Sequence, residues 1–530
     1  MRVILKIFFS SVLFTVAAAS FAQSESSFIE SRQLYIDQLY RRDTITHTAW
    51  KPVLLTDSTA QPSNHSWLRR KFFEEHLLSV QKPGFNLYAD VIVDEDIGYN
   101  SRAINPPNAS TQTYKVPVMN TRGYEVSGNI GDKFYFETNF YENQGRFPAY
   151  LDSLVRSTQV IPRQANYKNA LGDGPGFDFN YSTARLVYTP NKHLLFDLGY
   201  NHNFIGDGYR SLLLSDWSIN YPYFRAALTF GKLQYSVMWS QYINRIVSLS
   251  DIANSPYYAF GFSRKWAQTY LLDYAVTKKF NVGLFESVVW AGKDINRNSD
   301  VDITYASPII FAHSPQSKSG IDNNELIGLN LKYTFLPKAN VYSQLALDKT
   351  GSDADNRYAV QAGVRFWDFL KVKNWNALLE FNNVRPYTYS STNLHTVYGH
   401  ANLPLAHPLG ANFREVIGVT DYSFKHWWFR LEAFAARQGL DSTNGAINYG
   451  RNPFNGSVAY PSENITTGQG VKTNIYYGDL RIAYVLNPKT NLRLETGFTY
   501  RREKNAFNTF EDKYAYIGVR MSFRNLVYDF

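Results

Sequence analysis

The chain has 530 residues, no cysteine and a formal net charge of +9, and 16% of its residues are Tyr, Phe or Trp although its mean hydropathy is −0.33. The absence of cysteine excludes structural disulfides, thiolate nucleophiles, thiolate-bound metals and a lipid-modified cysteine after an export signal. The sequence also lacks a Gly-x-Ser-x-Gly elbow, a His-Glu-x-x-His helix and a strand-coupled Gly-x-Gly-x-x-Gly motif. We therefore expect no enzymatic activity and no cofactor.

The N-terminus has the pattern of an export signal. Arg2 and Lys6 precede an apolar run from Ile7 to Ala19, and small residues follow the run. The run is shorter than the ~20 apolar residues of a membrane-spanning helix, and its flanks are those of a cleaved signal. We predict a signal peptide over residues 1–22 with cleavage after Ala22; a retained anchor helix is the alternative.

The remainder of the chain contains no candidate for a transmembrane helix, since no run approaches about 18 uncharged apolar residues. Many aromatic residues combined with low hydropathy are typical of membrane β-barrels. Each barrel strand presents an apolar face to lipid and a polar face to the lumen, with aromatic girdles at both interfaces. We therefore predict an all-β fold, a transmembrane antiparallel β-barrel, with a soluble β-sandwich as the alternative.

The clearest predicted strand lies near the C-terminus, where apolar and polar side chains alternate over about the ~9–11 residues of a tilted spanning strand. The apolar face has Ala515, Ile517, Val519, Met521 and Phe523, and the other face has Tyr516, Gly518, Arg520, Ser522 and Arg524. The chain ends at Phe530. A terminal aromatic residue after an alternating strand resembles the C-terminal signature of outer-membrane barrels.

Four hairpins are predicted upstream from strand patterns on either side of short turns. The paired strands are 122–130 with 134–141, 182–188 with 194–200, 224–230 with 233–242, and 266–276 with 280–290. Short turns suit the periplasmic end, and the longer polar segments 143–176, 294–324 and 438–470 suit loops at the outer surface. We predict a barrel over residues 84–530 with an even number of strands, roughly 14 to 18.

Residues 23–83 differ from the barrel region, because apolar side chains fall there at helical spacing in two stretches. These positions are Phe28, Ile29, Tyr35, Ile36, Leu39 and Tyr40 in the first stretch and Trp67, Leu68, Phe72 and Leu78 in the second. We predict one or two amphipathic helices in a short periplasmic module. The module would be a plug or docking element, or a cap that protects strand edges, and the sequence leaves both open.

Two groups of motifs lie between predicted strands. The first, FIGDGYRSLLLSD, runs from Phe204 to Asp216; the second comprises VRPYTYS at 384–390, YGH at 398–400 and LAHPLGANFRE at 405–415. Together they resemble the Wzi-like family of capsule-assembly outer-membrane barrels, and in particular its Bacteroidetes branch of gliding-motility (RemB-like) proteins. One departure is the Gly-rich turn, which reads Ile-Gly-Asp-Gly here and more like Trp-Gly-Pro-Gly in enterobacterial members.

The resemblance implies a non-enzymatic, lectin-like protein that holds or organises extracellular polysaccharide. Carbohydrate binding uses aromatic rings that stack on sugars and planar polar groups that bond their hydroxyls. The candidate polysaccharide-binding residues within the motifs are Asp207, Tyr209, Arg210, Asp216, Arg385, Tyr387, His400, His407, Asn412 and Arg414.

The same residues have simpler structural interpretations. A tyrosine can belong to an aromatic girdle, arginines can line the lumen in ion pairs, and Asp207, Arg210 and Asp216 can form a network that holds a loop. A set of three histidines could bind a metal or include a general base, but their spacings match no helix face, and we predict neither a metal nor a catalytic residue. The three are His395, His400 and His407.

The positive charge favours acidic partners such as uronate-containing polysaccharide or the phosphates of outer-membrane glycolipid. Export, together with the lack of a basic run or a recognition helix, argues against nucleic acid. Three functions stay open. The leading hypothesis is attachment of capsular or exopolysaccharide at the outer membrane; the alternatives are an accessory of gliding motility, adhesion or secretion, with a periplasmic or motility-complex protein as partner, and a passive porin.

Overall fold

The computed structural model describes twelve stretches of the chain. They are residues 24–29, 46–58, 64–104, 113–169, 176–245, 263–291, 307–312, 323–348, 357–391, 393–442, 447–455 and 465–530. The predicted signal peptide over 1–22 lies outside the described residues, as does most of the first predicted helix.

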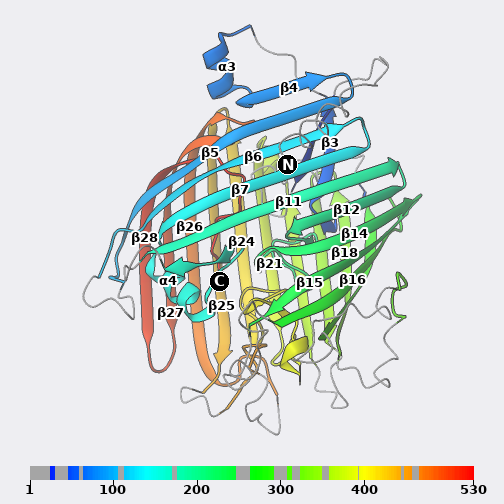
Figure 1. The fold of residues 1–530 in the computed structure, drawn as a ribbon. Coiled ribbons are helices and arrows are strands. Elements are labelled where there is room, and N and C mark those ends of the chain that lie inside the picture. Colours follow the sequence, from blue (N-terminus) through cyan, green and yellow to red (C-terminus); the bar gives the residue numbers. More distant parts are fainter. Residues whose placement is uncertain are drawn as a thin grey trace, which may run out of the picture.

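Eighteen of the described strands form one closed antiparallel barrel, in which each strand pairs with the next barrel strand along the chain and the last pairs with the first (Figure 1). The main sheet has 20 strands, of which the short strands β4 and β10 lie beside the ring and 18 close it. The first nine are β5 (Phe85–Asn100), β6 (Val118–Ile130), β7 (Phe134–Arg146), β11 (Phe177–Asn191), β12 (Leu194–Asn201), β14 (Tyr221–Phe230), β15 (Leu233–Asn244), β16 (Ser263–Ala275) and β17 (Phe280–Ala291). The other nine are β18 (Asn323–Leu336), β19 (Ala339–Asp348), β20 (Tyr358–Phe366), β21 (Trp375–Val384), β24 (Phe413–Phe424), β25 (Trp427–Leu440), β26 (Val471–Asn487), β27 (Leu492–Lys504) and β28 (Thr509–Arg520).

All four predicted hairpins are confirmed. They correspond to β6 with β7, β11 with β12, β14 with β15, and β16 with β17. Their turns are short and lie at one end of the barrel, and the long connections lie at the other. Because short turns face the periplasm in barrels of this kind, we assign the short-turn end to the periplasm and the long-loop end to the outside.

The wall has an apolar outer face and a polar inner face. In β28, Asp512, Tyr514 and Tyr516 are buried toward the lumen, whereas Ala515 and Ile517 are exposed on the outside. The outer face is apolar elsewhere too: Val91 is 57% exposed and Phe230 is 71% exposed. An even number of antiparallel strands with an apolar exterior is the architecture of an outer-membrane barrel, so the predicted fold class is confirmed. No helix in the described stretches is long and apolar enough to span a membrane.

The C-terminal end differs from the prediction. The wall strand stops at Arg520, and residues 521–530 turn into the lumen because Asp94 accepts hydrogen bonds from the backbone N–H groups of Met521 (2.7 Å) and Ser522 (3.0 Å). Met521 therefore packs on buried lumenal side chains, and the last strand, predicted to continue to Arg524, ends four residues earlier. Phe530 does not end a wall strand but lies buried inside the barrel.

The early departure of β28 leaves the first half of β5 without a neighbour on that side. The short strand β4 (Leu78–Lys82) covers it, pairing Leu78 with Ala89 and Lys82 with Phe85. A covered edge cannot pair with another chain.

A helical module over residues 23–83 is not confirmed. The described part contains the helix α3 (Trp67–Phe73), which matches the second predicted helix, but Phe28 and Ile29 lie in a strand and Leu78 begins β4. The other strands are β1 (Ser24–Ile29), paired with β3 (Val53–Ser58), and β2 (Trp50–Lys51), paired with β13 (Phe204–Ile205) inside the barrel. Periodicity alone missed these pairings because their partners are distant in sequence.

The segment 143–176 was predicted as a loop at the outer surface, but its residues 147–167 fold into the barrel instead. It contains the end of β7, the helix α4 (Ala149–Thr158) and the short strands β8 (Val160–Ile161), β9 (Ala165–Asn166) and β10 (Lys168–Asn169). Leu151 and Val155 of α4 are buried in a cluster with Trp217 and Phe530, so an apolar helix face holds the segment inside. Further short elements are β22 (Gly399–His400), β23 (Leu403–Pro404), η4 (Phe369–Lys371) and η5 (Leu394–Thr396).

Candidate functional site

The barrel lumen is occupied by segments from distant parts of the sequence. Within the described chain these are residues 46–52, 147–167, 202–220, 385–412 and 521–530, and most of their side chains are buried. We call them together the lumenal plug. The first of the two motif groups that resemble the Wzi-like family belongs to it, and so does the second group except for Val384 on β21 and residues 413–415 on β24.

Arg210 is the centre of a buried charge network. Its guanidinium donates to Glu415 on β24 (Nη2–Oε1, 2.8 Å) and to Asp529 (Nη1–Oδ2, 2.9 Å), and none of the three side chains is exposed. The Tyr209 hydroxyl donates to the same Asp529 carboxylate (2.8 Å), and Nε2 of His407 lies 2.9 Å from Glu415. Burial lowers the pKa of Arg210, but Asp529 and Glu415 outweigh this and hold the pKa well above its ordinary value. The network ties the first motif to the wall and to the C-terminus.

Asp207 connects the first motif to the N-terminal part of the plug. Its carboxylate accepts hydrogen bonds from the Thr48 hydroxyl and from the side-chain amide of Asn330 on β18 (3.0 Å). Burial raises the pKa of Asp207, but Lys332 and Lys51 more than compensate, so the pKa lies below its usual value. The Lys51 ammonium donates to the backbone carbonyl of Gly206. Asp207 is therefore an internal anion with protein partners.

The candidates in the second motif group also bond to protein. Nη2 of Arg385 donates to the carbonyl of Ile465 (2.8 Å), and the Tyr387 hydroxyl donates to the carbonyl of Asn448 (2.7 Å). The Asn412 amide donates to the carbonyls of Gly439, Tyr449 and Gln469 at 2.9 to 3.0 Å. The exposed Arg414 lies on β24 and its Nε donates to Asn383 (3.2 Å). Arg385, Tyr387 and Asn412 therefore hold the connection that follows β21 against the connection between β25 and β26.

The three histidines each have separate partners. His400 accepts from the backbone N–H of Ile243 at Nδ1 (2.9 Å), so its Nε2 carries the proton and faces the carbonyl of Asn220 (3.3 Å). Nδ1 of His395 lies 2.9 Å from the side-chain nitrogen of Asn244. The described residues include no group of three or more His, Asp or Glu side chains arranged to hold a metal.

Among the described residues, at least two cavities lie between the plug and the wall. The larger, with about 620 Å³ of empty space, we call the Arg–Tyr cavity. It is bounded by α4, the C-terminal segment and the lumenal faces of β5 to β7 and β26 to β28. Its polar and aromatic lining comprises Asp96, Thr121, Asn143, Arg146, Phe147, Tyr150, Gln164, Phe179, Arg481, Thr499, Tyr514, Tyr516, Arg520, Arg524 and Tyr528.

The lining of the Arg–Tyr cavity is cationic. Four arginines face it, and Asp96 is the one carboxylate in its lining. Arg524, Arg481 and Arg520 pair with Asp94, Asp479 and Glu495, which are not part of the lining. Arg146 is half-buried, with its guanidinium 5.1 Å from the centroid of the Tyr114 ring. All four guanidinium groups thus reach the cavity lining, three of them with a carboxylate partner, and a guanidinium is suited to bind an anionic ligand.

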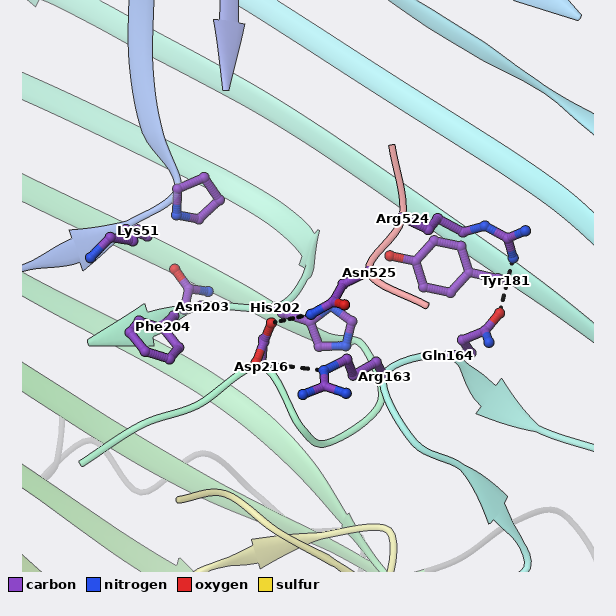
Figure 2. Close-up of a pocket in the computed structure, with 11 residues that line it drawn as sticks. Lys51, Arg163, Gln164, Tyr181, His202, Asn203, Phe204, Asp216, Arg524 and Asn525 are labelled. Carbon is purple, nitrogen blue, oxygen red and sulfur yellow. Dashed lines mark hydrogen bonds and ion pairs between the residues drawn. The ribbon is translucent and has the colours of Figure 1, made fainter. Parts of the chain in front are cut away.

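The second cavity, the Lys51 cavity, has about 430 Å³ of empty space (Figure 2). Asp216 faces this cavity between the side chains of Arg163 and Asn525. Arg524 donates a hydrogen bond to Gln164 (2.9 Å), and these two residues line both cavities. Burial, aided by Arg365 and Lys332, lowers the pKa of Lys51 to about 7 against the attraction of Asp207.

The cavities and the predicted site residues overlap little. Of the ten candidates, Asp216 lines the Lys51 cavity, and the other nine line neither the Lys51 cavity nor the Arg–Tyr cavity. Three lining residues of the Arg–Tyr cavity were partly predictable from the sequence. Tyr516, Arg520 and Arg524 were assigned to the polar face of the last strand. The remaining lining comes from at least six separate segments, whose juxtaposition no local pattern reveals.

No family model and no curated protein matches the sequence. Among solved structures, the chain is similar to Wzi of Escherichia coli, described as an outer-membrane protein involved in group 1 capsule assembly and a carbohydrate-binding β-barrel. The identity is 13%, the TM-score is 0.46, and the match covers 81% of this chain and 84% of Wzi.

The chain is similar to porin-type structures at a comparable level. OprD of Pseudomonas aeruginosa shares 11% identity with a TM-score of 0.41, covering 82% of this chain and 94% of OprD. OccAB2 of Acinetobacter baumannii shares 10% identity with a TM-score of 0.41, covering 81% and 97%. These similarities do not choose between capsule assembly and a porin, and the narrower resemblance to gliding-motility proteins stays a prediction.

Proposed function

We propose that this protein is a non-enzymatic outer-membrane barrel that binds an acidic polysaccharide and holds it at the cell surface. The observation that carries the proposal is the Arg–Tyr cavity, which combines four guanidinium groups with a set of tyrosine and phenylalanine rings. An exported protein would meet such a ligand outside the cell, as the signal peptide predicts.

The chemistry of the lining fits a uronate-containing glycan. Aromatic faces stack on the apolar faces of sugar rings, and guanidinium groups bind carboxylates in a planar, bidentate manner. The lining is a poor match for glycoside hydrolysis, which uses a pair of carboxylates on either side of the scissile bond. Its single carboxylate, Asp96, is already paired with Arg520 at 3.1 Å. Binding without catalysis is therefore the better interpretation.

A passive porin is the second candidate, because the barrel itself has the required wall. The lumenal plug argues against it: the network around Arg210 joins the first motif, β24 and the C-terminal segment across the lumen. Conductance in planar bilayers distinguishes the two, since a plugged barrel conducts little and an open porin conducts steadily.

Binding is tested on the purified barrel by calorimetry, with an oligouronate as ligand and a neutral oligosaccharide of the same length as control. Arg146→Gln removes one positive charge from the cavity lining. The other three lining arginines are in ion pairs, so their substitution would also leave a carboxylate without its partner. A hydrogen bond to a charged group contributes about 1.5–3 kcal/mol, so we expect affinity for the oligouronate to fall about 10- to 100-fold. Arg122→Gln, an exposed outer-wall arginine paired with Glu142, should leave affinity unchanged. Equal affinity for the neutral ligand would contradict the proposal.

The cellular role is tested by deleting the gene in its own host and measuring cell-associated and shed polysaccharide, with surface spreading recorded on the same cells. Polysaccharide lost from the cell but present in the medium would support attachment. Unchanged polysaccharide with lost spreading would instead favour a motility accessory with a periplasmic protein partner.

A further inference from the structure

The helix α3 and the start of β4 carry an unusual apolar surface at the periplasmic end of the barrel (Figure 1). Trp67, Leu68 and Phe72 are each 59 to 61% exposed, and Phe73 and Leu78 are about half exposed. Large apolar side chains grouped this densely on one short segment mark an interaction surface.

The helix is oriented with its charged side toward the barrel. Lys71 and Arg70 pair with Glu75 at 3.0 and 3.4 Å, and these side chains are largely buried. The Asn487 amide, at the end of β26, donates to the carbonyl of Glu75 (2.9 Å) and so fastens the end of α3 to the wall. Leu68 and Phe72, one turn apart, lie on a common side of the helix and are exposed. A helix whose exposed side faced water would present polar side chains at these positions.

The apolar surface is continuous with the outer face of the wall. In the pairing of β4 with β5, Leu78 lies opposite Ala89 and Val80 opposite Leu87, which places Leu78 and Val80 on the same face as the exposed Val91. That face is the lipid-facing exterior of the barrel. The side chains of α3 therefore extend the lipid-facing surface past the end of the strands.

We propose that α3 and the start of β4 form a membrane anchor that inserts into the interfacial region of the periplasmic leaflet. Trp and Phe side chains prefer this region. The Arg69 side chain is 62% exposed beside Glu74 (3.9 Å) and is long enough to extend toward lipid phosphates. The helix is short, but its attachment to β26 and β5 removes the need for it to bind the membrane independently.

The absence of cysteine in the chain allows a direct test. Single-cysteine variants Leu68→Cys and Phe72→Cys are spin-labelled in the full-length barrel reconstituted in phospholipid vesicles. Collision rates with oxygen, which concentrates in lipid, and with a water-soluble nickel chelate are then measured. Val91→Cys on the outer wall provides the lipid reference, and Asp132→Cys, in an exposed short turn, provides the aqueous reference.

We expect the ratio of oxygen to nickel collisions at positions 68 and 72 to lie well above that at 132 and to approach that at 91. A ratio equal to that at 132 would overturn the proposal, since it would place the helix in water. Low collision rates with both reagents would also overturn it, because they would show burial against protein, including a second copy of the chain. Retention of the folded, heat-modifiable form on electrophoresis verifies each labelled variant.

Discussion

The wall of the barrel and the lumenal plug are built on different principles. Every wall strand pairs with its neighbour along the chain, and only β28 with β5 joins distant residues. The plug contains few regular elements and is held by contacts between residues far apart, such as Arg524 with Asp94, which are 430 positions apart. Backbone hydrogen bonds stabilise the wall, whereas buried charges and aromatic rings specify the plug. Changes in the plug should therefore affect its packing before they affect the wall.

The largest effect is expected from deleting residues 521–530. The deletion removes Asp529 from its pairs with Arg210 and Arg163 and exposes the lumen, but it leaves the pairing of β28 with β5 complete. Single-channel recordings should show a clear rise in conductance, while the barrel keeps its heat-modifiable form. If the deletion abolishes barrel formation, the milder variant Asp529→Asn tests the same contact. Unchanged conductance would mean that the C-terminal segment does not close the lumen.

The next largest effect is expected from Arg210→Met. Removing the guanidinium leaves Glu415 and Asp529 as buried carboxylates without this partner, which costs about 3–5 kcal/mol of unfolding free energy. Urea unfolding of the reconstituted barrel measures the loss. The matched variant Arg122→Met breaks an exposed pair with Glu142 (3.3 Å) and should cost less than about 1 kcal/mol. Equal losses would show that burial does not distinguish the two pairs.

Acidification should loosen the plug before the wall. Burial lowers the pKa of His202 to about 4 and that of His400 to about 3, from 6.5. The unfolded state therefore binds more protons below pH 6.5, so the stability contributed by the neutral histidines is full above 6.5 and falls as the pH drops toward 4. Amide exchange at pH 7 and pH 4.5 should show loss of protection in residues 202–220 and 397–410. Wall strand β16 should keep its protection. An equal loss of protection in β16 would contradict the prediction that the plug loosens before the wall.

The smallest effect is expected from a single added methyl group. An alanine Cβ at Gly208 in the plug would lie 2.5 Å from Oε2 of Glu380 and 2.7 Å from Oε1 of Gln361, whereas at Gly478 in the wall it would meet nothing within 4 Å. Overpacking of this kind costs about 1–3 kcal/mol, so Gly208→Ala should lower the unfolding free energy by that amount. Gly478→Ala should be nearly neutral, and a larger loss there than at Gly208 would refute the packing argument.

The predictions from sequence succeeded where structure follows from neighbouring residues. The four hairpins and the alternation of Tyr516, Ile517 and Arg520 were predictable because a strand repeats every two residues and a short turn sets its partner. The same alternation was misleading beyond Arg520. Met521 and Phe523 continue the alternation in sequence. The backbone N–H groups of Met521 and Ser522 nevertheless bond to the carboxylate of Asp94, and the chain leaves the wall at this point.

The sequence by itself determined an aromatic-rich antiparallel barrel with one lipid-facing side, since alternation, turn residues and composition are local properties. Only the tertiary structure decided that the motifs around Arg210 and His407 lie inside the barrel, and that a cationic cavity forms from Arg146, Arg520 and Arg524. The physical reason is that ion pairs and cavity walls depend on which distant segments meet. Closure of the barrel brings these segments together in one lumen, and their contacts cannot be predicted from any single stretch of the chain.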